Sequence, residues 1–235
     1  MKLLLISNST MPGEAYLDYP KSEIKKFLGD EQITALFIPY AAVTFSFDLY
    51  EQKVVERFSE LGYQVKSIHR FNNPVQAVKD AEVIVVGGGN TWQLVRMMHD
   101  NQLMEVIREK VMSGTPYIGW SAGSNVACPT LRTTNDMPII DPRGFDTTGL
   151  VSFQINPHYL DANPEGHGGE TREQRIEEFL EINPDLYVVG LREGTMLRVE
   201  DHKMSMIGNR TARIFRKGRI PYELSAEEDF SFLLR

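Results

Sequence analysis

Residues 118–123 constrain the fold more than any other part of the sequence. An apolar run, 116–120, ends in Ser121, with Gly119 two residues before the serine and Gly123 two residues after it. This G-x-S-x-G spacing is typical of a nucleophile elbow, in which a strand turns sharply into a helix and presents a serine at the bend. The glycines are needed because larger side chains would clash in so tight a turn. A plain glycine-rich strand-to-helix turn is the alternative interpretation.

Short apolar runs alternate with helical patterns through the first half of the chain. The runs lie at 3–6, 35–40, 83–86 and 116–120, and continuous apolar runs of this length are typical of strands buried on both faces. Residues 65–68 are a further strand candidate. The alternation predicts right-handed crossovers and a mostly parallel central sheet covered by helices, which is a three-layer α/β sandwich. The active site of such a sheet lies beyond the carboxyl ends of its strands, where we expect the elbow.

The second half of the chain is more polar but continues the pattern. A short apolar run at 152–155 is predicted to be a strand, and another strand is expected at 186–191. Thr171 and Gln174 have the spacing of a capping box, which predicts a helix start. Short strands separated by glycines at 196–224 indicate an antiparallel edge. Because no linker or repeat interrupts the sequence, we expect one domain over 1–235.

Composition limits the classes of function. The formal net charge of −7 disfavours nucleic acid and anionic membranes as partners. The single cysteine, Cys128, excludes a disulfide within the chain and a cysteine zinc site, and no His-Glu-x-x-His pattern is present, so we expect no metal. The N-terminal apolar run is too short for a signal peptide, and no stretch reaches the length of a membrane span. These features predict a cytoplasmic protein.

Three polar residues at or just after predicted strand ends supply the groups that a serine hydrolase needs. Ser121 is a weak nucleophile until a base takes its proton, and histidine, here His158, is the residue type that most often serves as that base. Glu193 offers a carboxylate that can hold the imidazole in the required tautomer. Asp136 competes with Glu193 for that role, and His167 is the alternative base. Sequence spacing does not choose between the two acids.

The glycine run 87–89 has two interpretations. A phosphate-binding loop requires a following lysine and Ser/Thr, or a G-x-G-x-x-G pattern, and neither is present. An oxyanion hole requires a backbone N–H close to the nucleophile, which glycine permits. We therefore expect the N–H groups of Gly89 and Ala122 to be the oxyanion donors, with a tight turn that binds no ligand as the alternative.

Several motifs together resemble the peptidase E family of α-aspartyl dipeptidases. The similar segments occur in the same order and lie at 3–10, 87–91, 117–123, 132–138, 154–158 and 169–175. The resemblance extends to about Glu193 and implies a fold related to class I glutamine amidotransferases. It also implies a serine peptidase that cleaves dipeptides with an N-terminal aspartate and uses no cofactor.

The resemblance assigns roles to the residues already singled out. Ser121 matches the nucleophile of the family and His158 matches the base. Glu193 matches the usual third member, although Asp136 also matches a position assigned to the charge relay. The sequence departs from the family pattern at Arg192, where an uncharged residue is expected. A pairing of Arg192 with Glu193 would lower the basicity of that carboxylate.

The expected substrate is a small acidic dipeptide, whose side-chain carboxylate needs a cation. Arg172, at a predicted helix start in a matching motif, is the first candidate, Arg132 is the second, and Asn90 is a further candidate contact. The glycine-rich loop 161–169 is expected to act as a lid. A monomer or small homo-oligomer is expected. The alternative functions are a cyanophycinase-like hydrolase of β-linked aspartyl peptides and a binding protein that lost catalysis.

Overall fold

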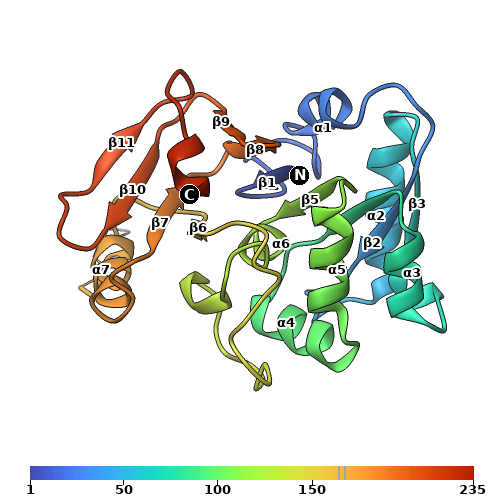
Figure 1. Ribbon diagram of the computed structural model, residues 1–235, viewed down its shortest axis with the longest axis horizontal. Coiled ribbons are helices and arrows are strands. Elements are labelled where there is room, and N and C mark those ends of the chain that lie inside the picture. Colours follow the sequence, from blue (N-terminus) through green and yellow to red (C-terminus); the bar gives the residue numbers. More distant parts are fainter. Residues whose placement is uncertain (164, 167) are drawn as a thin grey trace.

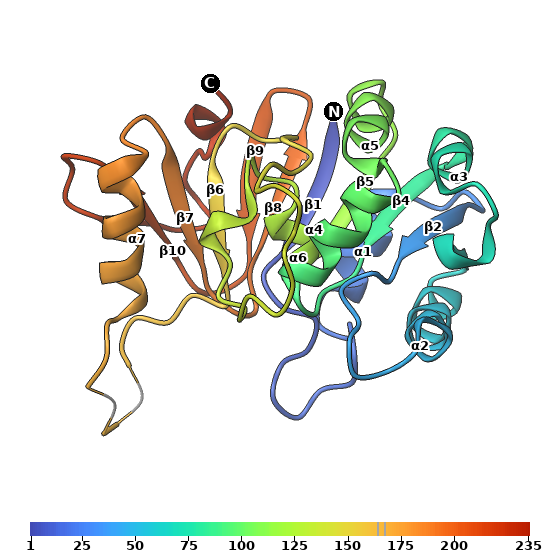
Figure 2. The ribbon, with the colours of Figure 1, turned by 90° about the horizontal axis from the view of Figure 1, so that it is seen from below.

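The computed structural model describes residues 1–163, 165–166 and 168–235. Two β-sheets form its framework (Figures 1 and 2). The seven-stranded sheet has the order β3 (Gln64–Ser67), β2 (Thr34–Ile38), β4 (Val83–Val86), β5 (Tyr117–Trp120), β1 (Lys2–Ile6), β8 (Met196–Glu200) and β9 (Lys203–Ile207). The four-stranded sheet has the order β11 (Tyr222–Leu224), β10 (Ala212–Arg216), β7 (Tyr187–Leu191) and β6 (Gln154–Pro157).

The first five strands of the seven-stranded sheet are parallel to one another. Four of them, β1, β2, β4 and β5, consist mainly of buried apolar residues, whereas the edge strand β3 is mostly polar. Parallel strands need crossover connections, and helices provide them here. The helices of the chain are α1 (Lys21–Leu28), α2 (Phe47–Glu60), α3 (Pro74–Asp80), α4 (Thr91–Asp100), α5 (Leu103–Met112), α6 (Ala122–Asn125) and α7 (Arg172–Ile182), with 3₁₀ turns η1 (Ile68–Arg70), η2 (Leu131–Thr133) and η3 (Ser231–Leu234). The predicted α/β class with a mostly parallel sheet is confirmed.

The alternating side chains of β1 show how the layers are built. Leu4 and Ile6 face one side, where they pack in the cluster that contains the buried residues of α1 and α2. Leu3 and Leu5 face the other side, in the cluster that contains buried residues of α3, α4 and α5. Both faces of the central strands are therefore covered, which explains why their sequences are apolar throughout.

The four-stranded sheet packs against the second of these clusters. Ile155 of β6, Val189 of β7 and Ile214 of β10 belong to the same core as Leu3 and Leu5. The opposite face of this sheet is covered by α7, as Figure 2 shows. The two sheets thus contribute to one continuous apolar core.

Capping contacts that are local in the sequence begin two of the helices. The Ser46 hydroxyl accepts a hydrogen bond from the backbone N–H of Leu49 at 3.2 Å and begins α2. Thr171 and Gln174 form the predicted capping box at the start of α7. Such caps satisfy N–H groups that have no partner within the helix, so they are readable without tertiary information.

The C-terminal strands differ from the prediction in two ways. Residues 196–224 do not form one antiparallel edge, because β8 and β9 extend the seven-stranded sheet whereas β10 and β11 belong to the smaller one. The smaller sheet is also mixed, since β6 and β7 are parallel. The larger sheet gains two strands because β1 is the last of the parallel strands and would leave its outer N–H and C=O groups unpaired. The antiparallel β8–β9 hairpin pairs with that edge.

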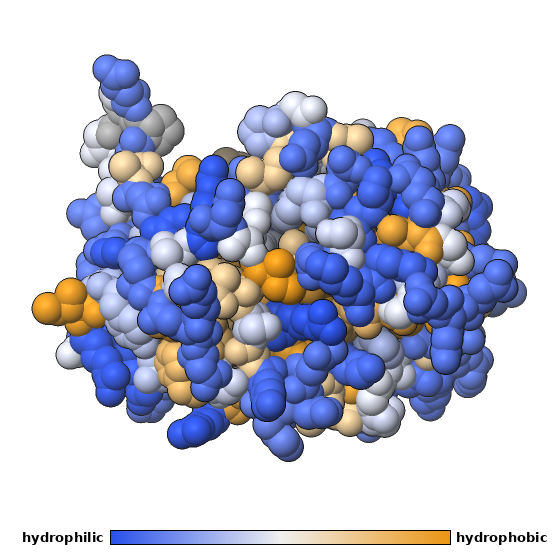
Figure 3. All heavy atoms as spheres, turned by 90° about the horizontal axis from the view of Figure 1, so that it is seen from above, coloured by the Kyte–Doolittle hydropathy of each residue, from blue (hydrophilic) through white to orange (hydrophobic). Residues whose placement is uncertain are grey.

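One face of the molecule is mostly polar. On the face in Figure 3, hydrophilic residues cover most of the area and hydrophobic residues form small separate groups. Within the described part of the chain, none of the helices has the length and apolar character needed to cross a membrane.

Candidate active site

The elbow at Ser121 has the strained backbone that its sequence predicts. Ser121 follows β5, caps α6 and has φ 54° and ψ −113°, a conformation that residues other than glycine rarely adopt. A Cβ added to Gly119 would press on the carbonyl of Gly123, and one added to Gly123 would press on the carbonyl of Val86. Both glycines are therefore required for the strand and helix to approach each other.

This close approach predicts a large loss of stability in Gly123→Ala. The added methyl group must displace the Val86 backbone, so we expect the free energy of unfolding to fall by about 3 kcal/mol. Urea denaturation followed by circular dichroism measures the change. Gly168→Ala is the matched control, because a Cβ there meets no atom of the described residues within 4 Å, and its effect should stay below about 0.5 kcal/mol. Equal midpoints for the two variants would contradict the packing argument.

Ser121, His158 and Glu193 form a hydrogen-bonded chain. His158 Nδ1 lies 2.6 Å from Glu193 Oε1, and His158 Nε2 lies 2.9 Å from Ser121 Oγ. A carboxylate only accepts, so Nδ1 carries the proton and Nε2 is left as the acceptor for the serine hydroxyl. This is the arrangement in which an imidazole can remove the serine proton.

Strand register explains why these residues meet. Pro157 at the end of β6 pairs with Leu191 at the end of β7, so His158 and Glu193 leave neighbouring strands at the same edge. Ile6 of β1 pairs with Trp120 of β5, which brings residue 7 beside Ser121. The two sheets are thus joined at the point where the three side chains converge.

Ser7 and Asn8 join the segments that carry the site, a role that the sequence did not reveal. The Ser7 hydroxyl donates to the carbonyl of Leu191 at 2.7 Å and accepts from the backbone N–H of His158 at 3.0 Å. Asn8 Oδ1 accepts from the backbone N–H of Gly194 at 2.9 Å. Both side chains are buried. These contacts depend on segments about 150 to 190 residues away, so the sequence could not reveal them. The only local signal was that both polar residues directly follow a predicted strand.

A cleft of about 400 Å³ opens at Ser121. Its lining includes Gly88 and Gly89, whose N–H groups donate no hydrogen bond within the described residues. Tyr50 supports this wall, since its hydroxyl donates to the Gly88 carbonyl at 2.9 Å and accepts from Trp120 Nε1 at 3.2 Å. Burial raises the pKa of Tyr50 to about 12, so the hydroxyl stays protonated.

Asp136 is oriented by the start of α4 and forms no hydrogen bond or ion pair with His158 among the described residues. Its Oδ2 atom accepts from the backbone N–H of Thr91 at 2.7 Å and from the Thr91 hydroxyl at 2.6 Å. Asn90 also serves this helix start: its Oδ1 accepts from Gln93 N at 3.1 Å, while its Nδ2 donates to the Met137 carbonyl at 3.0 Å. The polar atoms of Asn90 are therefore engaged within the protein, which favours a positioning role over a substrate contact.

Arg172 lies in a second hollow of about 170 Å³ that also contains Asp136 and Arg132. Burial and the charge of Arg175 lower the pKa of Arg172, whereas Asp136 raises it; a guanidinium remains charged at neutral pH in any case. Arg132 is exposed and its guanidinium stands 4.8 Å from the ring centre of Phe145. The more enclosed of the two arginines is Arg172.

The predicted pairing of Arg192 with Glu193 is wrong. Arg192 instead binds Asp161 and Glu223, with 2.8 Å between its Nη1 and Glu223 Oε2. Successive side chains in extended backbone point to opposite sides, so Arg192 reaches Glu223 of β11 while Glu193 reaches His158. His167, the alternative base, lies outside the described residues, as does part of the loop 161–169. The lid assignment therefore stays a prediction.

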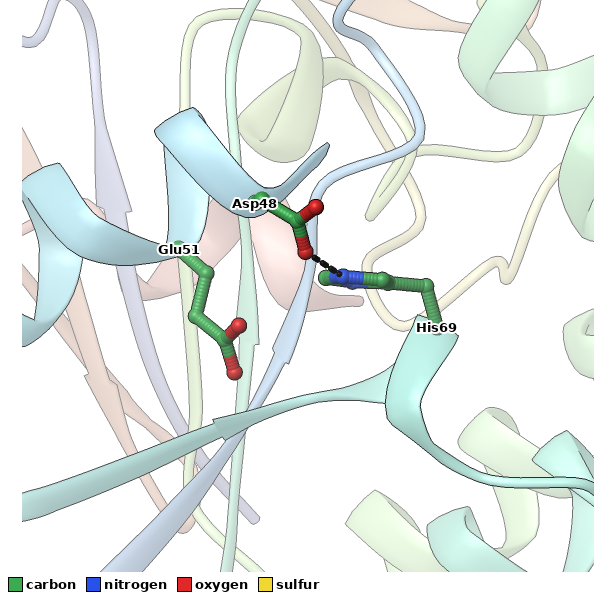
Figure 4. A group of neighbouring side chains, drawn as sticks. All are labelled: Asp48, Glu51 and His69. Carbon is green, nitrogen blue, oxygen red and sulfur yellow. Dashed lines mark hydrogen bonds and ion pairs between the residues drawn. The ribbon is translucent and has the colours of Figure 1, made fainter. Parts of the chain in front are cut away.

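A group of potential metal ligands lies at the start of α2 and in η1 (Figure 4). His69 Nε2 is 3.0 Å from Asp48 Oδ1, and His69 Nδ1 is 2.6 Å from Ser67 Oγ. Arg70 contacts Asp48 and lies 2.9 Å from Glu51 Oε2. Because a guanidinium already neutralises both carboxylates, the group is better explained as a network that fastens η1 to α2 than as a cation site.

The fold and the Ser–His–Glu chain define a serine peptidase. The model of the peptidase family S51 matches residues 3–207. The chain belongs to this family. It is 52% identical over 233 residues to peptidase E of Nostoc sp., covering 99% of this chain and 96% of the relative. It is 47% identical over 230 residues to peptidase E of Salmonella paratyphi A, covering 98% and 100% of the two chains.

Solved structures show the same fold at lower identity. A peptidase from an acI-B1 Actinobacterium has a TM-score of 0.69 and 22% identity, covering 98% of this chain and 96% of the other. A protein from Listeria monocytogenes EGD-e has a TM-score of 0.59 and 21% identity, covering 95% and 98%. These likenesses support the architecture, including the smaller C-terminal sheet.

Proposed function

We propose that the protein is an α-aspartyl dipeptidase that hydrolyses Asp-Xaa through an acyl-enzyme intermediate. The observation that carries the proposal is the unbroken contact from Glu193 through His158 to Ser121 in a chain that belongs to peptidase family S51. The intact chain of contacts disfavours the alternative of a binding protein that lost catalysis. The substrate is a small acidic dipeptide, and no residue of the proposed mechanism requires a cofactor.

In the first half of the reaction, Ser121 attacks the peptide carbonyl while His158 Nε2 takes the serine proton. Glu193 stabilises the imidazolium that forms. The N–H groups of Gly89 and Ala122 hold the oxyanion. In support, the N–H group of Gly89 has no partner among the described residues, and Ala122 is the first residue of α6. His158 then protonates the leaving amine, and water reverses these steps.

The proposed specificity residue is Arg172, which would bind the aspartyl side chain. It lies in the hollow that adjoins the Ser121 cleft through Asp136 and forms no ion pair with the described carboxylates. A guanidinium binds a carboxylate through two parallel hydrogen bonds, so an aspartyl side chain is a suitable ligand. Arg132 is the weaker candidate because it is exposed and occupied with Phe145.

A substrate panel tests the function. The purified protein is incubated separately with Asp-Leu, β-Asp-Leu, Ala-Leu and an Asp-Arg polymer. Chromatography quantifies the leucine released from the three dipeptides and the Asp-Arg dipeptide released from the polymer. We expect Asp-Leu to be cleaved with the highest kcat/KM. Preferential cleavage of β-Asp-Leu or of the polymer would favour the cyanophycinase-like alternative and overturn the proposal.

The proposed role of Arg172 predicts a selective loss in Arg172→Ala. We expect kcat/KM for Asp-Leu to fall about a hundredfold, since a desolvated charge pair is removed, with little change for Ala-Leu. Initial rates with both dipeptides measure the selectivity. Arg132→Ala is the control and should change the Asp-Leu value by less than about fivefold. Equal losses for Asp-Leu and Ala-Leu would reject the specificity role.

A further inference from the structure

Asp136 is the residue shared by the Ser121 cleft and the Arg172 hollow. Its Oδ2 atom accepts three hydrogen bonds, two from Thr91 and one from the Thr134 hydroxyl at 3.1 Å. Its Oδ1 atom accepts none of the hydrogen bonds formed among the described residues. One carboxylate oxygen is thus fixed to the protein, while the other is left for a ligand between the two cavities.

Lys53 of α2 is the only lysine or arginine among the residues that line the Ser121 cleft. Within the described chain it forms no ion pair, and its Nζ atom stands 5.2 Å from the ring centre of Phe45. Phe45 packs on Tyr50 with 5.2 Å between ring centres, and Tyr50 binds the Gly88 carbonyl beside the nucleophile. This unpaired cation is therefore linked by direct packing to the wall of the reaction site.

The positions of these charges follow an order. Arg172 lines only the hollow, Asp136 lines both cavities, and Lys53 lines only the cleft. An Asp-Xaa dipeptide carries its charges in the same order: the side-chain carboxylate and the ammonium group belong to the acyl residue, and the free carboxylate belongs to the leaving residue. Opposite charges attract, so this order favours one direction of binding.

We propose that Asp136 binds the free α-ammonium group of the substrate and that Lys53 binds the free α-carboxylate of its leaving residue. The inference rests on the proposed dipeptidase function and extends it to both ends of the substrate. In a tripeptide the terminal carboxylate lies one residue further from the scissile bond, so the contact with Lys53 is lost. The pair of charges thereby explains a preference for dipeptides over longer peptides.

Three matched substrates test the two contacts. Asp-Leu has both termini, succinyl-Leu lacks only the ammonium group, and Asp-Leu amide lacks only the terminal carboxylate charge. We expect Lys53→Met to lower kcat/KM for Asp-Leu about tenfold and for Asp-Leu amide less than twofold. We expect Asp136→Asn to lower kcat/KM for Asp-Leu about a hundredfold and for succinyl-Leu less than threefold.

Lys66→Met is the matched control for Lys53→Met. Like Lys53, Lys66 is exposed and stands near an aromatic ring, 4.5 Å from the ring centre of Phe71, but it lies outside the cleft. Lys66→Met should therefore leave kcat/KM unchanged for all three substrates. A Lys53→Met variant that loses equal activity toward Asp-Leu and its amide overturns the Lys53 assignment. Equal losses toward Asp-Leu and succinyl-Leu in Asp136→Asn overturn the Asp136 assignment. If the wild type cleaves none of the three, both the proposed function and this inference are wrong.

Discussion

Replacing Ser121 with alanine is expected to lower kcat for Asp-Leu by at least about 10⁴-fold. The change removes the only hydroxyl that lies 2.9 Å from His158 Nε2 among the described residues, and with it the acyl-enzyme route. Residual turnover would come from water activated in the same site. The cleft walls and the proposed charge contacts remain, so the affinity for the dipeptide should change little. Quenched reactions analysed by chromatography measure kcat, and calorimetric titration with Asp-Leu measures the affinity.

Ser152→Ala is the matched control for this prediction. The Ser152 hydroxyl donates to the Leu233 carbonyl at 2.8 Å and takes no part in the cleft. Its loss should reduce the free energy of unfolding by about 1 kcal/mol and leave kcat unchanged. A Ser121→Ala enzyme that keeps more than about one hundredth of the wild-type kcat would refute the nucleophile assignment, given the size of effect that such a residue has in serine peptidases.

Signals that act within a few residues predicted the local structure well. The capping box at Thr171 was predictable because its contacts lie within three residues, and β4 was predictable because its whole sequence is apolar. The elbow was also predictable, because Gly119 faces the carbonyl of Gly123 within the same motif, although Gly123 itself faces the carbonyl of Val86 in β4. Helix caps and tight turns restrict which residues fit, whatever the rest of the fold does.

Sheet membership was not predictable from such signals. The strands at 196–224 have the correct apolar spacing, but the edge that each strand joins depends on which backbone groups other segments leave unpaired. The same limit affected the site. Glu193 and Asp136 both follow plausible structural elements, and only the register of β6 against β7 sets Glu193 beside His158. The partners of Arg192 and the linking role of Ser7 are equally non-local.

Glu193→Gln is expected to lower kcat by about 10³ to 10⁴-fold while leaving the fold intact. The carboxylate accepts from His158 Nδ1 at 2.6 Å, which keeps Nε2 free to accept the serine proton. An amide can present its NH₂ group to Nδ1 instead and stabilise the opposite tautomer, and it no longer stabilises the imidazolium. The loss should therefore appear in kcat more than in KM. Steady-state kinetics with Asp-Leu, together with the urea midpoint, measure both effects.

Comparison with Asp136→Asn separates the two acids that the sequence left open. Glu193 acts on the base and not on the substrate, so Glu193→Gln should lower kcat for Asp-Leu and for succinyl-Leu by the same factor. Asp136 binds Thr91 and lines the cleft, and it forms no hydrogen bond with the imidazole among the described residues. The loss of activity in Asp136→Asn should therefore depend on whether the substrate carries an ammonium group. If Asp136→Asn slows both substrates equally and Glu193→Gln retains more than about a tenth of kcat, Asp136 and not Glu193 supports the base.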